Sequence, residues 1–154
     1  MPQFDTMLAL ASGLGLAVFE MDFESSAKAL IKGKKIAIRK SMDRTTKACA
    51  LCEEIGHDQT GAGDIIDQSS ISNRQQEVRA RQWAHHCLIP FERIIDAHKA
   101  RISGRYELAE FLGVTEEFLQ SAIDRFTAKY GIFLKVNDQY TIKFDPLGVL
   151  EIFP

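Results

Sequence analysis

The chain has 154 residues, of which 45% are hydrophobic and 26% are charged. This length suits one average domain, and the composition is that of a folded globular protein, which excludes a disordered or collagen-like chain. The formal net charge is −2. The chain as a whole is therefore not a polycation that binds nucleic acid through phosphate neutralisation alone.

The sequence also indicates a compartment. Its apolar runs are too short to span a membrane, and the opening segment MPQFDTMLAL lacks the basic start of a secretory signal. The three cysteines are odd in number and too few for a disulfide framework. These features predict a cytoplasmic protein with no membrane partner.

The first forty residues carry helical and then strand periodicity. Phe4, Met7 and Ala11 share helical spacing, which predicts a helix that ends near Gly13. Alternating apolar residues over 17–23 predict a strand. Two short apolar runs, 29–31 and 36–38, predict a hairpin with a lysine-rich turn. An N-terminal helix and a small antiparallel sheet are therefore expected.

Basic residues gather on this hairpin and just after it. Eight of them stand against one acid, Asp43: Lys28, Lys32, Lys34, Lys35, Arg39, Lys40, Arg44 and Lys47. Lysines on a hairpin can protect an edge strand from pairing with other chains. They can equally form a platform for an acidic partner. The sequence leaves both interpretations open.

The rest of the chain is mostly helical. Helices are expected from about Asp43 to His57, over 73–88, from Phe91, and as a pair divided at Gly113, with a loop over 58–72. A β-hairpin is expected at the end, around Asn137 and Asp138. The prediction is an α+β fold with a boundary between 1–90 and 91–154, the two parts packed as one unit.

The letters E-E-x-x-H at Glu53, Glu54 and His57 suggest metal chemistry. Residues four apart lie on one face of a helix, so Glu53 and His57 can reach a common ion, with Glu54 beside it to take a proton from metal-bound water. A third ligand has to come from elsewhere, and Glu77 in the next helix is the best-placed carboxylate.

Simpler interpretations exist for each of these residues. Glu53 and His57 lie roughly opposite the apolar face of their helix, where charged residues usually meet solvent. Arg81, four residues after Glu77, can pair with it and compete with a metal. Cys49 shares the stripe of Glu53 and can replace or supplement it as a ligand, or can be a small buried residue.

Two adjacent histidines, His85 and His86, also fall in the helix expected over 73–88. One of them could assist an oxyanion in a cleft. The simpler expectation is a pair of partly exposed side chains.

A wider pattern resembles a known family. The stretch KACALCEEIGHDQTGAGDIID, followed by RQQEVRARQWAHHCLIP and YELAEFLGVTEEFLQSAIDRF, is similar to the ImmA/IrrE zinc metallopeptidases, which are often encoded beside a helix-turn-helix repressor in prophages and mobile elements. The resemblance implies a zincin-like active-site helix within a metallopeptidase-like core over 1–90. It also implies a helical lobe over 91–154 with a short helical pair. The spacing expected of a helix-turn-helix is present in that pair, at Leu108, Ala109, Leu112, Gly113, Val114, Phe118 and Ile123.

Carried over residue by residue, the resemblance assigns His57 and Glu77 as metal ligands and Glu54 as the general base. Glu53 stands where the family has its first histidine. Two carboxylates and one imidazole neutralise a divalent ion, so the metal-bound water would be less acidic than in a site with two histidines. The expected cofactor is zinc, with manganese or another divalent ion as the alternative.

Three functions follow as hypotheses. The first is a metal-dependent peptidase that cleaves a helix-turn-helix repressor. The second is a catalytically inactive regulator that binds a protein on the same fold. The third is a DNA-binding transcription factor, which Glu116 and Glu117 disfavour because they would bring two carboxylates to the phosphates from the helix end that reads bases.

Overall fold

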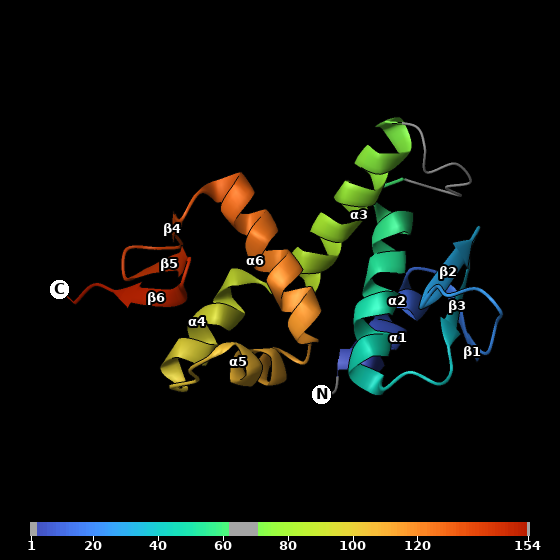
Figure 1. The fold of residues 1–154 in the computed structure, drawn as a ribbon, viewed down its shortest axis with the longest axis horizontal. Coiled ribbons are helices and arrows are strands. Elements are labelled where there is room, and N and C mark those ends of the chain that lie inside the picture. Colours follow the sequence, from blue (N-terminus) through green and yellow to red (C-terminus); the bar gives the residue numbers. More distant parts are fainter. Residues whose placement is uncertain (1–2, 62–70, 154) are drawn as a thin grey trace. The chain divides into compact units, whose positions relative to one another are not determined.

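The computed structural model describes residues 3–61 and 71–153, except for the side chains of 71–73. It confirms the α+β prediction: helices and strands form two compact units that divide between Leu88 and Ile89 (Figure 1). We call these the N-terminal and C-terminal units. Of the loop expected over 58–72, residues 62–70 lie outside the described part of the chain.

The N-terminal unit begins with helix α1 (Gln3–Gly13) and a three-stranded sheet. The strands are β1 (Ala17–Met21), β2 (Ala29–Lys32) and β3 (Lys35–Arg39), in the order β1-β3-β2. The expected antiparallel pair is β2 and β3, whereas β1 joins β3 in parallel, so the sheet is mixed. Ile36 and Ile38 of the central strand are fully buried and form the inner face.

Helix α2 (Arg44–Gln59) covers this inner face and contacts α1. Its start is fixed by Asp43, whose Oδ1 accepts a hydrogen bond from the backbone N–H of Thr46 at 2.8 Å. These backbone and side-chain hydrogen bonds from Thr46 lower the pKa of Asp43. The apolar face expected from the sequence is fully buried, as Ala48, Leu51, Cys52 and Ile55 show.

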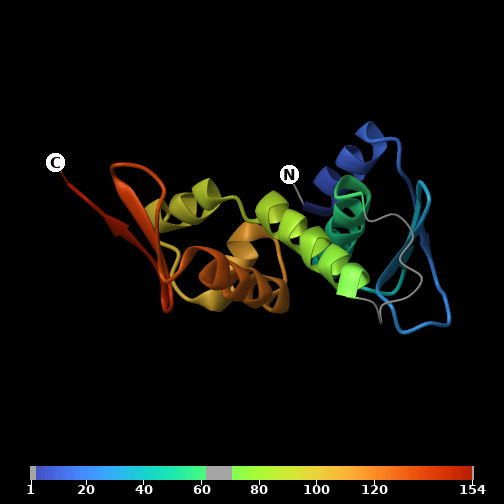
Figure 2. The same ribbon diagram turned by 90° about the horizontal axis from the view of Figure 1, so that it is seen from above.

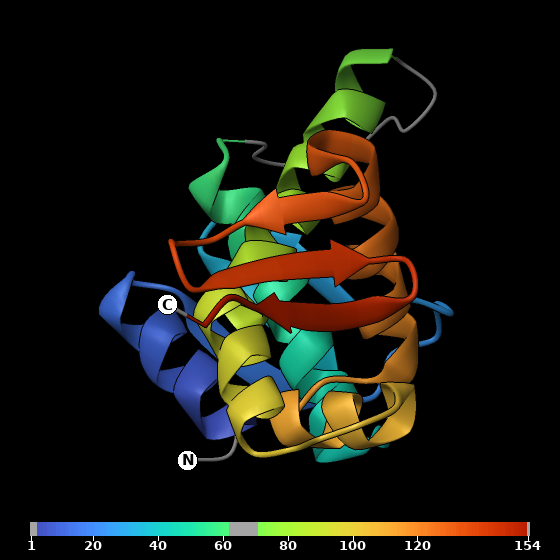
Figure 3. The same ribbon diagram turned by 90° about the vertical axis from the view of Figure 1, so that its left-hand side faces the viewer.

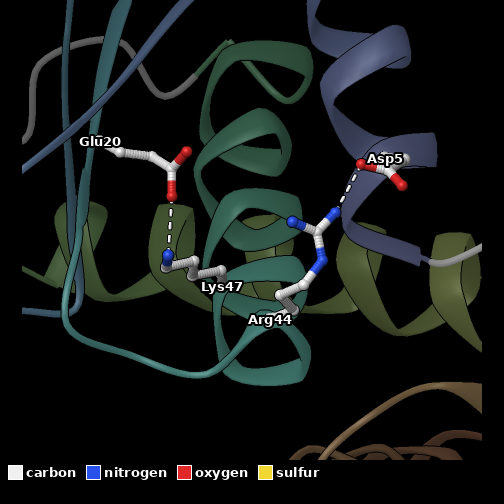
Figure 4. A network of polar contacts seen from close by, with 4 residues as sticks. All are labelled: Asp5, Glu20, Arg44 and Lys47. Carbon is white, nitrogen blue, oxygen red and sulfur yellow. Dashed lines mark hydrogen bonds and ion pairs between the residues drawn. The ribbon is translucent and has the colours of Figure 1, made fainter.

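Two ion pairs attach the first turn of α2 to its neighbours (Figure 4). Arg44 contacts Asp5 of α1 at 2.6 Å, and Lys47 contacts Glu20 of β1 at 2.7 Å. The first pair is exposed and adds little stability. The second holds the almost buried ammonium of Lys47 on the inner side of the sheet, which fixes the direction in which β1 presents its side chains.

Helix α3 (Ile71–Leu88) packs along α2, and the two helices lie side by side in Figures 1 and 2. Its contact face is made of small residues, Ala80 and Ala84, which are fully buried. The helix ends before Pro90, as the sequence predicts, because proline cannot continue the hydrogen-bond ladder.

The C-terminal unit has its own core. It contains α4 (Phe91–Lys99), α5 (Arg105–Leu112) and α6 (Glu116–Tyr130), and the break between α5 and α6 falls at Gly113, whose φ of 73° suits glycine. Phe91, Phe126 and Phe144 meet at its centre, with ring centroids 5.1 Å apart for the first two and 5.7 Å for the last two.

A second sheet closes this unit and appears face-on in Figure 3. The expected hairpin is β4 (Phe133–Lys135) and β5 (Tyr140–Phe144), and a further strand, β6 (Leu147–Glu151), pairs with β5. The strand β6 was not expected from the sequence, because Pro146 and Gly148 are typical of turns. Both are tolerated here: Pro146 lies in the turn that precedes the strand, and Gly148 lies on an edge strand.

Among the described helices, none is long and apolar enough to cross a bilayer.

The cap at Asp43 yields a first prediction. Asp43→Ala should lower the free energy of unfolding of the N-terminal unit by about 1 kcal/mol, because the N–H of Thr46 loses its acceptor. Asp43→Asn, which keeps an acceptor oxygen, should lie much closer to the unsubstituted protein. Urea unfolding followed through Trp83, the single tryptophan and part of α3, measures this unit. Equal losses in both variants would refute the cap as the cause.

Candidate functional site

The candidate site rests on the contact between α2 and α3. Gly56 lies in the middle of this contact: a Cβ atom at this position would stand 2.4 Å from the carbonyl oxygen of Ala80. One turn earlier, the Sγ of Cys52 lies 3.8 Å from the carbonyl oxygen of Ala84. At Gly56, the backbones of α2 and α3 are therefore too close for a side chain to lie between them. Gly56 was expected to end the helix near His57, but α2 continues to Gln59, and the glycine serves packing instead.

This close approach brings His57 and Glu77 together. Nε2 of His57, from α2, lies 3.3 Å from Oε1 of Glu77, from α3. The imidazole is 7% exposed, so the interpretation of this position as part of a solvated helix face is wrong. The reason is that α3 packs over this part of α2. The sequence of α2 alone does not indicate that contact.

Burial sets the charge of His57. Removal from water lowers its pKa, the neighbouring carboxylate of Glu77 opposes that shift, and Arg81 adds to it. The neutral imidazole is the form that binds metals. Its Nδ1 atom is buried, and no group in the described part of the chain forms a hydrogen bond with it.

The two glutamates of α2 are half-buried beside it. Burial, together with the carboxylates of Glu53 and Glu77, raises the pKa of Glu54 to about 7. Burial also raises the pKa of Glu53, although the positive charges of Arg81 and Lys28 counteract it. The carboxylate of Glu77 adds to the raised pKa of both glutamates. Carboxyl groups with perturbed pKa values are typical of functional sites.

The predicted triad of ligands is only partly assembled. His57 and Glu77 are in contact, whereas Glu53 is not gathered with them: the described residues contain no group of three His, Cys, Asp or Glu side chains arranged to hold a metal. Cys49 is buried and does not complete such a group.

Two further residues of this helix pair are buried, one as expected and one not. Cys52 is fully buried, and its thiol forms a hydrogen bond with that of Cys87 on α3, which raises the pKa of Cys52 and lowers that of Cys87. His85 was expected to be partly exposed, but it is 2% exposed.

The chain belongs to the family described as the IrrE N-terminal-like domain, Peptidase M78, whose model matches residues 11–124. The fold is therefore that of a zincin-like metallopeptidase. No curated protein and no solved structure matched the chain. The family membership implies a divalent metal ion, typically zinc.

The chemistry of His57 and Glu77 fits such an ion. The imidazole is held neutral, its Nδ1 has no hydrogen-bond partner in the described residues, and a half-buried carboxylate already touches its other nitrogen. Nitrogen and carboxylate oxygen are ligands that zinc and manganese both accept. The signal that could have located the contact in advance is the set of small residues, Gly56, Ala80 and Ala84.

The helix contact predicts the effect of a single methyl group. Gly56→Ala should lower the free energy of unfolding by about 1–3 kcal/mol, because the Cβ meets backbone rather than a flexible side chain. Gly13→Ala is the matched control, since a Cβ there meets nothing within 4 Å, and it should be close to neutral. Urea unfolding of both variants, followed through Trp83, makes the comparison. Equal stability of the two variants would show that α2 and α3 are not in tight contact.

The raised pKa of Glu54 predicts how stability depends on pH in the presence of a chelator. The folded chain holds this proton up to about pH 7 and the unfolded chain only up to its ordinary pKa near 4.5, so stability falls as the pH rises through this window. Glu54→Gln carries no titrating group there and should gain stability over the parent protein, by at most about 3 kcal/mol above pH 7. Parallel stability curves for the two proteins between pH 4.5 and 8 would contradict the assignment.

Proposed function

We propose that the protein is a metal-dependent peptidase that hydrolyses a peptide bond in a helix-turn-helix repressor. The observation that carries the proposal is the contact of His57 with Glu77 across two helices of a metallopeptidase fold. The E-E-x-x-H motif alone holds only residues of one helix, whereas a metal site needs a ligand from a second element. The repressor as substrate rests on the family resemblance.

In this proposal, His57 and Glu77 hold the metal, and Glu53 is the third ligand in place of a histidine. The bound ion would polarise the scissile carbonyl and lower the pKa of a water molecule. The carboxylate of Glu54 would accept a proton from the attacking water and return it to the nitrogen of the departing amine as the C–N bond breaks. A carboxyl group whose pKa lies near 7 is suited to both steps, because it accepts and releases a proton at neutral pH.

Burial of the carboxylates supports this division of roles. Half-buried Glu53 and Glu54 repel each other and Glu77, so the chain without a cation keeps them together at a cost in free energy. Arg81 and Lys28 offset part of the charge of Glu53, but its pKa is raised all the same. A divalent cation would compensate the remaining charge.

The second candidate function is a regulator that binds a protein partner without cutting it. The observation in its favour is that Glu53 is not gathered with His57 and Glu77 among the described residues. Such a regulator would have the same fold as the peptidase and would differ from it in metal content and in the cleavage of its partner.

The test is metal analysis of the tag-free protein after incubation with zinc or manganese. We expect about one metal ion per chain, lost in both His57→Ala and Glu77→Ala, because each removes a ligand. His98→Ala is the matched control, because His98 lies in the C-terminal unit, where it contacts Glu151 at 3.2 Å. This variant should retain the metal.

Cleavage separates the two candidates. The loaded protein should cut a purified helix-turn-helix repressor, as followed by mass spectrometry, and Glu54→Gln should bind the metal normally and fail to cut. Metal binding without cleavage in the unsubstituted protein would favour the regulator. The absence of metal in the unsubstituted protein, after reconstitution with either ion, would refute the peptidase.

A further inference from the structure

The outer face of the N-terminal sheet is apolar across its middle. Phe19 of β1 is 50% exposed, Leu30 of β2 is 48% exposed, and both stand opposite Ala37 of the central strand, so the three form one row across the sheet. Met21, two residues further along β1, is 47% exposed on the same face. Large apolar side chains that are half-exposed together mark a surface that binds a partner.

The rows beside this apolar row are basic. Lys32 and Lys35 stand directly opposite each other on β2 and β3. Arg39, in register with Met21, donates hydrogen bonds to the backbone carbonyls of Phe23 and Ala27. The outward residues of the three strands include no carboxylate, since Glu20 of β1 points to the inner side, where it binds Lys47. The outward side chains of the strands are therefore apolar or positively charged.

Protection of a sheet edge can explain Lys32, which lies on the edge strand β2, but it does not explain Lys35. Lys35 belongs to the central strand, which has a neighbour on both sides and no free edge. Like charges directly opposite each other destabilise a sheet, so the pair with Lys32 costs stability. Lys34, in the turn between them, is already paired with Asp58 at 2.7 Å. An occupant with negative charge would remove the repulsion between the two outward lysines.

We propose that this outer face, defined by Phe19, Met21, Leu30, Lys32 and Lys35, binds an acidic amphipathic segment of a partner protein. The apolar side of the segment covers the apolar row, and its carboxylates meet the lysines. A second copy of the chain is a poor occupant, because face-to-face contact would bring lysines against lysines. The surface goes beyond the proposed function: it lies on the side of the sheet opposite to α2, which carries Glu54 and His57 (Figure 1).

The probe is a fluorescein-labelled peptide that forms an amphipathic helix, with leucine on one side and glutamate on the other. Fluorescence anisotropy in the presence of a chelator should show saturable binding that weakens as salt is added. The chelator makes the result independent of the metal site. A version of the peptide with lysine in place of glutamate should not bind.

Substitutions locate the surface. Leu30→Ser, and separately Lys32→Glu with Lys35→Glu, should weaken binding at least roughly tenfold. Leu150→Ser is the matched control, since Leu150 is 49% exposed on β6 of the other sheet, and Lys129→Glu on α6 is the control for charge. Neither should change binding. The double variant Lys32→Glu with Lys35→Glu changes exposed positions only, so it tests the surface even where Leu30→Ser fails to fold.

Three results would overturn the proposal. The first is no saturable binding of the acidic peptide. The second is an equal loss in the two control variants, which would indicate unspecific attraction. The third is binding to vesicles of anionic phospholipid, lost in Leu30→Ser, without binding of the peptide, which would assign the face to a membrane surface.

Discussion

The absence of a side chain at Gly56 is the constraint on which the candidate site depends. Because a Cβ atom there would stand 2.4 Å from the carbonyl of Ala80, α2 and α3 can approach only with glycine at this position. The neighbouring residue, His57, is then carried to within 3.3 Å of Glu77. The same approach excludes water from both helices. The packing of the two helix backbones therefore determines where His57 lies. It also removes the imidazole from water, which lowers its pKa.

Burial of carboxylates away from water costs free energy, and this cost indicates a functional role. Burial raises the pKa of Glu53 and Glu54, the carboxylate of Glu77 adds to both shifts, and burial lowers the pKa of His57 beside them. Arg81 and Lys28 offset this cost only in part, because the pKa of Glu53 is still raised. Proteins keep unfavourable groups together where chemistry requires them, and in a metallopeptidase fold that chemistry is activation of water beside a cation.

The small sheet shows how one element serves two tasks. Its inner face, with Ile36 and Ile38, supports α2 and so positions the site. Its outer face holds apolar and basic side chains that the core does not need. Since strand residues alternate between the two faces, the two tasks are encoded in alternate residues of the same strands. A substitution on the outer face can therefore change partner binding and leave the support of α2 intact.

Local patterns determined much of this protein. Helical spacing, the cap at Asp43 and the break at Gly113 gave the helices, and the four-residue spacing of Glu53 and His57 identified one helix of the site, because these properties need only neighbours in sequence. Only the tertiary structure decided that His57 and His85 are buried, that β1 runs parallel to β3, that β6 completes the second sheet, and that Glu77 rather than Glu53 touches His57. The physical reason is that burial, strand pairing and contacts between helices depend on which distant segment packs opposite, and no local period in the sequence specifies that segment.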